Sequence, residues 1–342
     1  MLASRAVAPS ARSHPDAMIP TLEALPQATV FTVRDASHML LAAPLVKLSR
    51  GLPVWSNLIT PLTNGDTPHV DAERATPALA ALLDHLDAPV LLRGIPLQGT
   101  FWPALTATGA RLKVLRRWQR ASLQISGSYD QWLSANVDNK RRKEYRRLRV
   151  RLAEQGDLRS EVLGPGAPVG PWVDDFLQLE AAGWKGGRGT ALNQQPGFAQ
   201  ALHKIAEAMH ARGALRFWRI RLNDKTLGTL FAIVEVGQAW LGKIAYDEAF
   251  ARFSPGVMVI FDATESLFAE PGLKLADSCA IPDHPMINNI WRDRLEMADV
   301  LVAGPSVSSL RFNATAAAEN LRHKLRSTAR DALMRLKGRK RS

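Results

Sequence analysis

Three apolar segments in quick succession constrain the fold of this chain more than any other feature. Alternating apolar and polar residues predict a strand in each of them, at 215–222, 226–236 and 239–247. The residues between them, Asn223-Asp224 and Gly237-Gln238, suit tight turns, so the three strands should form an antiparallel meander. A turn, an apolar helix and another strand at 274–281 follow. This half of the chain is therefore predicted to have the order βββαβ.

Two predicted helices precede the meander. The first, at 172–182, has one apolar face, and the second repeats apolar residues at helical spacing from Phe198 to Met209. Between them lies GWKGGRGTAL at 183–192, whose glycines predict a flexible basic loop. Helices and an antiparallel meander in one segment indicate the α+β class.

The first half of the chain is predicted to be a second α+β unit. Strands are predicted at 29–34, 89–93, 111–116 and 120–126, helices at 76–86, 101–108 and 128–155, and a long connection at 45–71. Residues 1–27 are rich in Ala, Pro and Ser without an apolar period, and are expected to be a disordered lead-in. The sequence GPGAPVGP at 164–171 is predicted to connect the two halves.

Length and composition agree with two folded lobes in a reducing compartment. A chain of 342 residues exceeds one ordinary domain, and its 46% hydrophobic and 22% charged residues exclude disordered, collagen-like and coiled-coil chains. Cys279 is the only cysteine, and no spacing of Cys or His predicts a metal site. The first twenty residues lack the apolar core of a signal peptide, and the most apolar stretch, 227–241, is too short to span a bilayer. We therefore expect a cytoplasmic protein without a bound metal.

Two basic clusters carry much of the net charge of +12, at 140–151 and at 322–341. Such clusters attract polyanions, although a solvated helical face explains them equally well. From Ala316 the chain is predicted to form a basic amphipathic helix. This helix is expected either to contact an anionic membrane surface or to be a solvated extension.

A candidate anion site follows the last strand of the meander. The strand ends at Asp247, a loop with Arg252, Ser254 and Gly256 follows, and a helix starts near Val257. Free backbone N–H groups at the start of a helix favour a diphosphate, and Gly256 permits close approach. The alternative is an ordinary capped helix beside an exposed arginine.

Three sequence blocks resemble those of a known superfamily. They are FLQLEAAGWKGGRGTAL at 176–192, GKIAYDEAFARFSPGVM at 242–258 and DSCAIPDHPMI at 277–287. They resemble the GNAT acetyltransferases, in particular the CelD-like members associated with bacterial polysaccharide synthesis. The first half more loosely resembles the matching half of Fem-type peptidyltransferases, which carry two GNAT-like lobes in tandem.

The resemblance implies tandem GNAT-like lobes with mixed, mostly antiparallel sheets flanked by helices. The predicted parts are a lead-in at 1–27, an N-terminal lobe at 28–163 ending in a long basic helix, a C-terminal acyltransferase lobe at 172–303, and a basic helical tail at 304–342. The implied reaction moves an acyl group from acetyl-CoA or another acyl-CoA to an amine or hydroxyl. The implied acceptor is a small molecule or glycan of the cell envelope or an exopolysaccharide. The alternatives are a Fem-like ligase that uses aminoacyl-tRNA and an inactive scaffold of a polysaccharide synthase.

The resemblance also assigns the cofactor site. The implied cofactor-binding residues are Lys243, Ile244, Ala245, Arg252, Ser254, Gly256 and Val257. Two features depart from the family pattern. The first glycine of the phosphate loop falls on Pro255, or is shifted by one residue, and the tyrosine that often protonates the leaving thiolate has no counterpart on a later helix.

Polar residues in the matching blocks are the candidates for chemistry. A histidine titrates near neutral pH, so His284 is predicted to be the general base, with Asp277 and Lys185 as further catalytic candidates. Each has a structural alternative: a loop-fixing histidine, a capping aspartate and a surface lysine. The predicted substrate-binding residues are Trp184, Tyr246, Asp247 and Asp283. Lys243 and Asp247 lie four residues apart on one strand and are predicted to pair.

Overall fold

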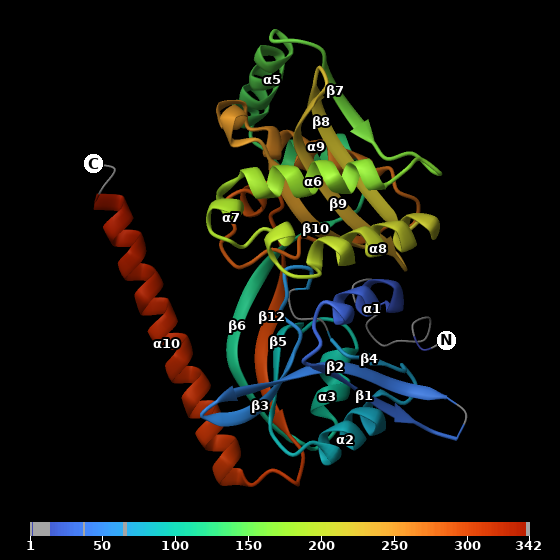
Figure 1. The fold of residues 1–342 in the computed structure, drawn as a ribbon, viewed down its shortest axis with the longest axis vertical. Coiled ribbons are helices and arrows are strands. Elements are labelled where there is room, and N and C mark those ends of the chain that lie inside the picture. The colour runs from blue at the N-terminus through green and yellow to red at the C-terminus, as the bar shows by residue number, and fades with distance from the viewer. Residues whose placement is uncertain (1, 3–13, 37, 64–66, 340–342) are drawn as a thin grey trace.

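The structure is a computed structural model that describes residue 2 and residues 14–36, 38–63 and 67–339. In these residues all strands belong to one sheet that runs through two halves of the molecule, drawn below and above in Figure 1. The strands are β1 (Ala28–Arg34), β2 (Met39–Arg50), β3 (Leu52–Asn57), β4 (His69–Val70), β5 (Val90–Pro96), β6 (Arg111–Gln124), β7 (Leu158–Val162), β8 (Leu215–Leu222), β9 (Lys225–Glu235), β10 (Gln238–Tyr246), β11 (Leu275–Asp277) and β12 (Asp293–Ala303).

The sheet has the order β1-β2-β3-β5-β12-β6-β11-β10-β9-β8-β7, with β4 beside β2. Neighbouring strands are antiparallel except β3 with β5 and β10 with β11. This confirms the predicted mixed, mostly antiparallel α+β architecture, as one continuous sheet. The antiparallel pairing of β8 with β9 and of β9 with β10 confirms the predicted meander. Its two tight turns place Asn223, Val236 and Gly237 at positive φ.

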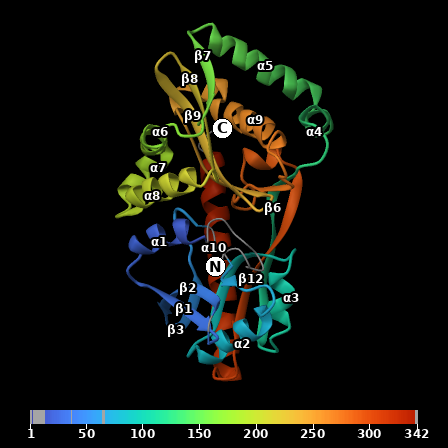
Figure 2. The ribbon, with the colours of Figure 1, turned by 90° about the vertical axis from the view of Figure 1, so that its right-hand side faces the viewer.

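Helices pack against the sheet in both halves of the molecule (Figure 1). They are α1 (Pro15–Glu23), α2 (Ala75–His85), α3 (Phe101–Thr106), α4 (Tyr129–Asn136), α5 (Asn139–Ala153), α6 (Gly170–Ala182), α7 (Trp184–Gly187), α8 (Phe198–Ala211), α9 (Pro255–Phe268) and α10 (Ser309–Arg339). Figure 2 shows α6, α7 and α8 on one side of the upper sheet and α4, α5 and α9 on the other. A separate apolar core lies on each side, so the sheet separates two layers of side chains.

The long strand β6 joins the two halves. Residues 111–122 pair with β12, and residues 122–124 pair with β11 on the opposite edge. Ser122 is therefore flanked by Asp293 on one side and Asp277 on the other. The sequence predicted two strands here, at 111–116 and 120–126, but the backbone stays extended between them.

Several elements differ from the prediction because distant contacts decide them. The predicted lead-in at 1–27 is wrong over α1, which packs on α8 through Ala17, while residues 1 and 3–13 of the lead-in lie outside the described residues. The predicted connection at 45–71 is wrong over its first part, where β2 and β3 form a hairpin around Gly51. The predicted helix 128–155 is two helices, because Val137 is extended.

Strand pairing crosses the predicted division between the lobes. β7 precedes the connection at 164–171 but pairs with β8 in the upper half. β12, from the segment predicted as the C-terminal lobe, pairs with β5 and β6. Neither β7 nor β12 was predicted, because short edge segments and late strands carry little local signal.

Helix α10 starts at Ser309, before the predicted start at Ala316. Phe312 and Ala316 pack against Leu301 of β12 and anchor its first turns. Farther along, Leu321 and Leu325 are 58% and 62% exposed. No helix in the described ranges is both long and apolar enough to span a bilayer.

Candidate functional site

The site forms where β10 leaves its neighbour β11. The two strands pair only over residues 238–240 and 275–277, whereas β10 continues to Tyr246. The pairing of β10 with β9 shifts register between Leu241 and Ile244. Gly242 lies in this shift, where a Cβ atom would overlap the Phe231 ring. The bulge turns the next side chain, Lys243, toward α6.

A buried carboxylate connects α6, α7 and β10. Oε1 of Glu180 accepts hydrogen bonds from Nζ of Lys185 at 2.8 Å and from Nζ of Lys243 at 2.7 Å. Oε2 accepts from the Leu192 amide at 2.8 Å. The Glu180 side chain is only 1% exposed. One buried anion thus holds two ammonium groups, which leaves a net charge of +1 when all three are ionised.

The charges of this cluster shift the pKa values of Glu180 and Lys243. Burial alone would raise the pKa of Glu180, but the charges and hydrogen bonds of Lys243 and Lys185 outweigh it, and the pKa is lowered. The pKa of Lys243 is also lowered, first by burial and then by repulsion from Lys185, despite the attraction of Glu180. Lys243 therefore gives up its proton more readily than an ordinary lysine.

The glycine-rich segment is an ordered turn rather than the flexible loop predicted from its sequence. Residues 184–187 form α7, and Gly186 packs so closely on α6 that a Cβ atom there would overlap the Ala181 carbonyl. The Thr190 amide donates to the Lys185 carbonyl at 2.9 Å. These contacts fix Lys185 beside Glu180. Trp184 is 53% exposed beside them, and its amide donates to Oε1 of Glu248 at 2.8 Å.

His284 lies on the loop that follows β11. Its Nδ1 accepts from the amides of Met286 at 3.3 Å and Ile287 at 3.4 Å. Because Nδ1 is the acceptor, the neutral ring carries its proton on Nε2. Burial, and then repulsion from Lys185, lower the pKa of His284. The neutral form of the ring is therefore favoured at pH 7, with Nε2 able to donate, and the role of general base stays a prediction.

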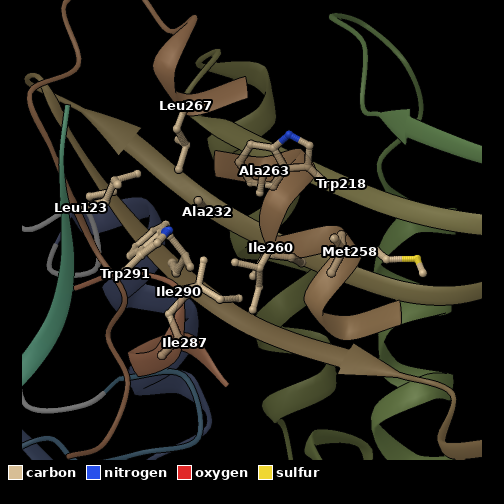
Figure 3. Close-up of a cluster of buried hydrophobic side chains, with 14 of the residues drawn as sticks. Leu123, Trp218, Ala232, Met258, Ile260, Ala263, Leu267, Ile287, Ile290 and Trp291 are labelled. Carbon is tan, nitrogen blue, oxygen red and sulfur yellow. The ribbon is translucent and has the colours of Figure 1, made fainter. Parts of the chain in front are cut away.

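The loop carrying His284 is anchored in the core. Figure 3 shows Ile287, Ile290 and Trp291 packed beside Ile260 of α9. The Trp291 indole donates to Oγ1 of Thr264 at 3.0 Å. Just before His284, the predicted substrate residue Asp283 adopts a φ of 59°, which the tight turn requires. The fixed loop gives His284 a defined position at the end of the splayed strands.

Asp277 is engaged in holding the backbone. Its Oδ2 lies 3.1 Å from NH1 of Arg120, and its Oδ1 accepts from the Cys279 amide at 2.7 Å. Both side chains of the Asp277–Arg120 pair are buried. Cys279 has a φ of 51°, so this bond stabilises a strained turn. The geometry agrees with the capping alternative for Asp277.

The predicted pair of Lys243 and Asp247 does not form. Lys243 binds Glu180, whereas Asp247 lies 2.6 Å from Nζ of Lys225 and accepts from the Ala249 amide. The bulge changes the direction of Lys243, and β10 ends before Asp247, so the two side chains do not share a face.

The turn before α9 is more closed than the predicted diphosphate site requires. Pro255 has no N–H, and the Ser254 amide donates to the Ala251 carbonyl. The amides of Val257 and Met258 both donate to the Ser254 carbonyl. Ser254 itself has a φ of 57° and gives no side-chain cap. The turn thus has few amides left for a phosphate.

Side chains also cover this turn. A Cβ atom on Gly256 would lie 2.9 Å from the Tyr246 ring and 3.2 Å from Cε of Met286. Arg252 is exposed and lies over the Phe253 ring, with its guanidinium carbon 4.7 Å from the ring centroid. The residues present at this turn therefore do not fit the diphosphate of a coenzyme A.

A small cavity of about 30 Å³ lies between α6, α7 and β10. Its lining includes Glu180 and five predicted site residues, which are Trp184, Lys185, Ile244, Ala245 and Tyr246. The structure thus brings the predicted residues of 184–185 and 243–246 together, with His284 near Lys185. It places Asp277, Asp247 and Arg252 in other contacts.

Glu180 was not predicted as a site residue from the sequence. It lies one helical turn from Phe176 and Leu177, on the apolar face of α6. A charged residue on a buried helical face is rare unless it is paired, and this was the signal in the sequence. Among the described residues, no group of three or more His, Cys, Asp or Glu side chains is arranged to hold a metal ion.

Comparisons with known proteins give one family match and several structures of similar fold. Residues 139–282 match the family described as acetyltransferase (GNAT) domain. Comparison with curated protein sequences gave no match. Among solved structures, the chain is similar to FemX, with 13% identity, a TM-score of 0.56, and coverage of 86% of this chain and 94% of that one.

Two further structures share the fold. The C-terminal domain of a putative lysylphosphatidylglycerol synthetase from Agrobacterium fabrum has 13% identity and a TM-score of 0.58, covering 93% of this chain and 95% of that chain. L-PGS from Bacillus licheniformis has 12% identity and a TM-score of 0.54, covering 87% and 90%. The GNAT part of the predicted resemblance is confirmed for residues 139–282, which match a GNAT acetyltransferase domain, and the chain is similar in fold to FemX and these synthetase domains.

Proposed function

We propose that the protein transfers an acyl group from an activated donor to an amine or hydroxyl, at the cluster of Glu180, Lys185, Lys243 and His284. The observation that carries this proposal is the single buried carboxylate that holds two lysines at the end of β10. Perturbed titratable groups at a fixed position beside a cavity are typical of acid–base catalysis. The match of residues 139–282 to an acetyltransferase family supports the same reaction class.

In this mechanism Lys243 accepts the proton of the attacking group. Its lowered pKa increases its neutral fraction at a given pH. The nucleophile forms a bond to the donor carbonyl carbon, and its proton passes to Nζ of Lys243. When the tetrahedral intermediate collapses, the leaving thiolate or alkoxide takes that proton back. No covalent enzyme intermediate is needed.

His284 and Lys185 stabilise the negative charge that develops on the carbonyl oxygen. The neutral His284 ring donates from Nε2, because its Nδ1 is occupied by backbone amides. Lys185 contributes a positive charge that lies close enough to His284 to lower the pKa of its ring. Fixed donors of this kind stabilise a transition state without reorganisation. Glu180 positions both lysines and balances part of their charge.

Acyl-CoA remains the proposed donor, and an envelope or exopolysaccharide precursor the proposed acceptor, on the strength of the sequence resemblance. The closed turn before α9 favours aminoacyl-tRNA as the alternative donor, since the predicted diphosphate contacts are occupied within the chain. The basic helix α5 favours the same alternative, because exposed basic side chains such as Arg146 and Arg151 would attract RNA.

We also propose that α10 brings the protein to an anionic membrane surface where such acceptors are assembled. Leu321 and Leu325 are exposed on a helix that carries Arg322, Lys324 and Arg326. Exposed apolar residues between basic ones are typical of helices that lie on lipid surfaces. Vesicles with anionic lipid should retain the protein, and neutral vesicles should not.

The proposal is tested by measuring transfer from each donor. The purified protein is incubated with acetyl-CoA or with aminoacyl-tRNA and a panel of amino sugars, and product is followed by mass spectrometry. Wild type should give product with one donor, and Lys243→Met should reduce the rate by about 100-fold, as expected for loss of a proton acceptor. Product from neither donor, or equal rates for wild type and Lys243→Met, would leave the scaffold alternative.

A further inference from the structure

A second cavity lies on the face of the sheet opposite to Glu180, between α4, α5 and α9. Its volume is about 170 Å³. It is lined by Tyr129, Leu133, Arg142, Tyr145, Arg146, Arg149, Met258, Phe261 and Asp262. We call it the α5 groove. The proposed mechanism uses none of these residues.

The walls of the α5 groove are aromatic. The rings of Tyr145 and Phe261 lie with their centroids 5.0 Å apart. Tyr129 stacks on Trp132 at 5.9 Å and contributes a third ring. Aromatic walls of this kind favour a planar ring, which stacks on them with little dependence on its substituents.

The charges of the α5 groove are unbalanced. The carboxylate of Asp262 is already taken by Arg149, with contacts of 2.9 Å and 3.4 Å, and by Ser160. Within the described part of the chain, neither Arg142 nor Arg146 has a carboxylate at ion-pair distance. Nε of Arg142 is buried without a hydrogen-bond acceptor among the described residues. A guanidinium in this state favours an anion.

We propose that the α5 groove binds a nucleotide, with the base against Tyr145 and Phe261 and a phosphate against Arg142 and Arg146. A planar aromatic group that carries an anion is the ligand chemistry that satisfies both features together. An acidic peptide would satisfy the arginines but would leave the three aromatic rings without a partner. A neutral aromatic compound would leave the charges of Arg142 and Arg146 unbalanced. It would also leave Nε of Arg142 without an acceptor, because only the other two nitrogens of Arg142 are bonded, to Ser134 and Asn139.

Helix α5 connects the α5 groove to the proposed transfer site. The inference drawn from this connection rests on the proposed function. NH1 of Arg141 on α5 donates to the Asn289 carbonyl at 3.3 Å, which connects α5 to the loop that carries His284. The turn before α9 has few amides for a diphosphate, so the phosphates of a donor need cations elsewhere. Adenosine with attached phosphate is common to acyl-CoA and to the 3′ end of tRNA. The groove would therefore hold the adenosine end of either donor.

Calorimetry with adenosine 3′,5′-bisphosphate tests the proposal on the full-length protein. Wild type should bind it, and ribose 5-phosphate should bind far more weakly because it has no base. Arg142→Glu with Arg146→Glu should weaken binding by about 100-fold, since each arginine contributes a charged hydrogen bond worth about a factor of ten. The matched control is Lys140→Glu with Lys143→Glu, which makes the same charge change on the exposed face of the same helix.

The controls separate specific binding from general attraction. Equal losses in the two double variants, or equal binding of ribose 5-phosphate, would show diffuse attraction by α5 and overturn the proposal. Tyr145→Leu should weaken binding of the bisphosphate while the circular dichroism spectrum stays unchanged. Retained affinity in a folded Tyr145→Leu protein would contradict the stacking role and with it the nucleotide.

Two further probes identify the source of the nucleotide. Competition of adenosine 3′,5′-bisphosphate by coenzyme A indicates a coenzyme donor, and competition by a short RNA ending in CCA indicates tRNA. Binding in the groove without acyl transfer from either donor would contradict the proposed function alone. Transfer by a protein that does not bind the bisphosphate would contradict the groove alone.

Discussion

The Lys243 ammonium lies 2.7 Å from the Glu180 carboxylate and joins the bulge of β10 to the end of α6. Lys185 shares the same carboxylate oxygen. The two lysines therefore depend on Glu180 for their position, and repulsion from Lys185 lowers the pKa of Lys243. The first two predictions follow from this arrangement.

Glu180→Gln should lower the free energy of unfolding by about 3 kcal/mol, because it leaves two partly buried ammonium groups without their buried anion. Urea denaturation measures the change. The folded pKa of Glu180 is below its ordinary value of 4.5, so its stabilising contribution is full above that pH and is lost as the pH falls. The difference between wild type and variant should therefore shrink in acid. The control Glu23→Gln removes an exposed partner of Lys204 and should change stability little.

Lys185→Met should move the pH dependence of transfer to higher pH. Repulsion from Lys185 lowers the pKa of Lys243, so its removal raises that pKa, and a higher pH is needed to form the neutral amine. The rate–pH profile of wild type and variant, measured at saturating donor, gives the shift. An unchanged acidic limb would show that Lys243 is not the proton acceptor.

His284 gives a contrast between two substitutions. Asparagine can place an oxygen near the position of Nδ1, which keeps the loop bonds but removes the Nε2 donor. Glutamine can place its amide near Nε2, which keeps a donor but loses the loop acceptor. His284→Asn should therefore lower kcat by about 100-fold with stability nearly unchanged. His284→Gln should retain more activity than His284→Asn. If the rate–pH profiles of both variants lose their acidic limb instead, His284 acts as a base.

Gly186→Ala should destabilise the protein by about 2 kcal/mol and reduce activity, because the added methyl group overlaps the Ala181 carbonyl and displaces Lys185. Gly187→Ala is the matched control, since a Cβ atom there meets nothing within 4 Å. Thermal denaturation and the transfer rate distinguish the two. Equal effects of the two substitutions would mean that the close packing of α7 on α6 does not fix Lys185.

Local patterns predicted the elements that local physics determines. The meander and α8 were predicted correctly, because alternation, turn residues and helical spacing are read directly from neighbouring residues. Helix α1 was missed because burial of Ala17 against α8, a contact far along the chain, stabilises it. The single strand β6 was divided in two, because pairing with β12 keeps it extended.

The site was predicted in its location but not in its contacts. The sequence blocks pointed to Lys185, Lys243 and His284. In the structure the two lysines bind one carboxylate, and His284 lies close enough to Lys185 for that charge to lower its pKa. Glu180 was missed because one acidic residue in a helical pattern does not reveal its partners. The expected pairing of Lys243 with Asp247 failed because a bulge, which moves a side chain to another direction, leaves no mark in the alternation.

The strand β6 also limits how the protein can move. Its hydrogen bonds pair it with β12 in the lower half and with β11 beside the site, and one bulge at Leu115 is the only register shift along this pairing among the described residues. A hinge between the halves would have to break these bonds, so the molecule is stiff along this strand. Entry and release of substrates must then depend on side chains and short segments at the surface, and turnover should be insensitive to cross-links that join the two halves.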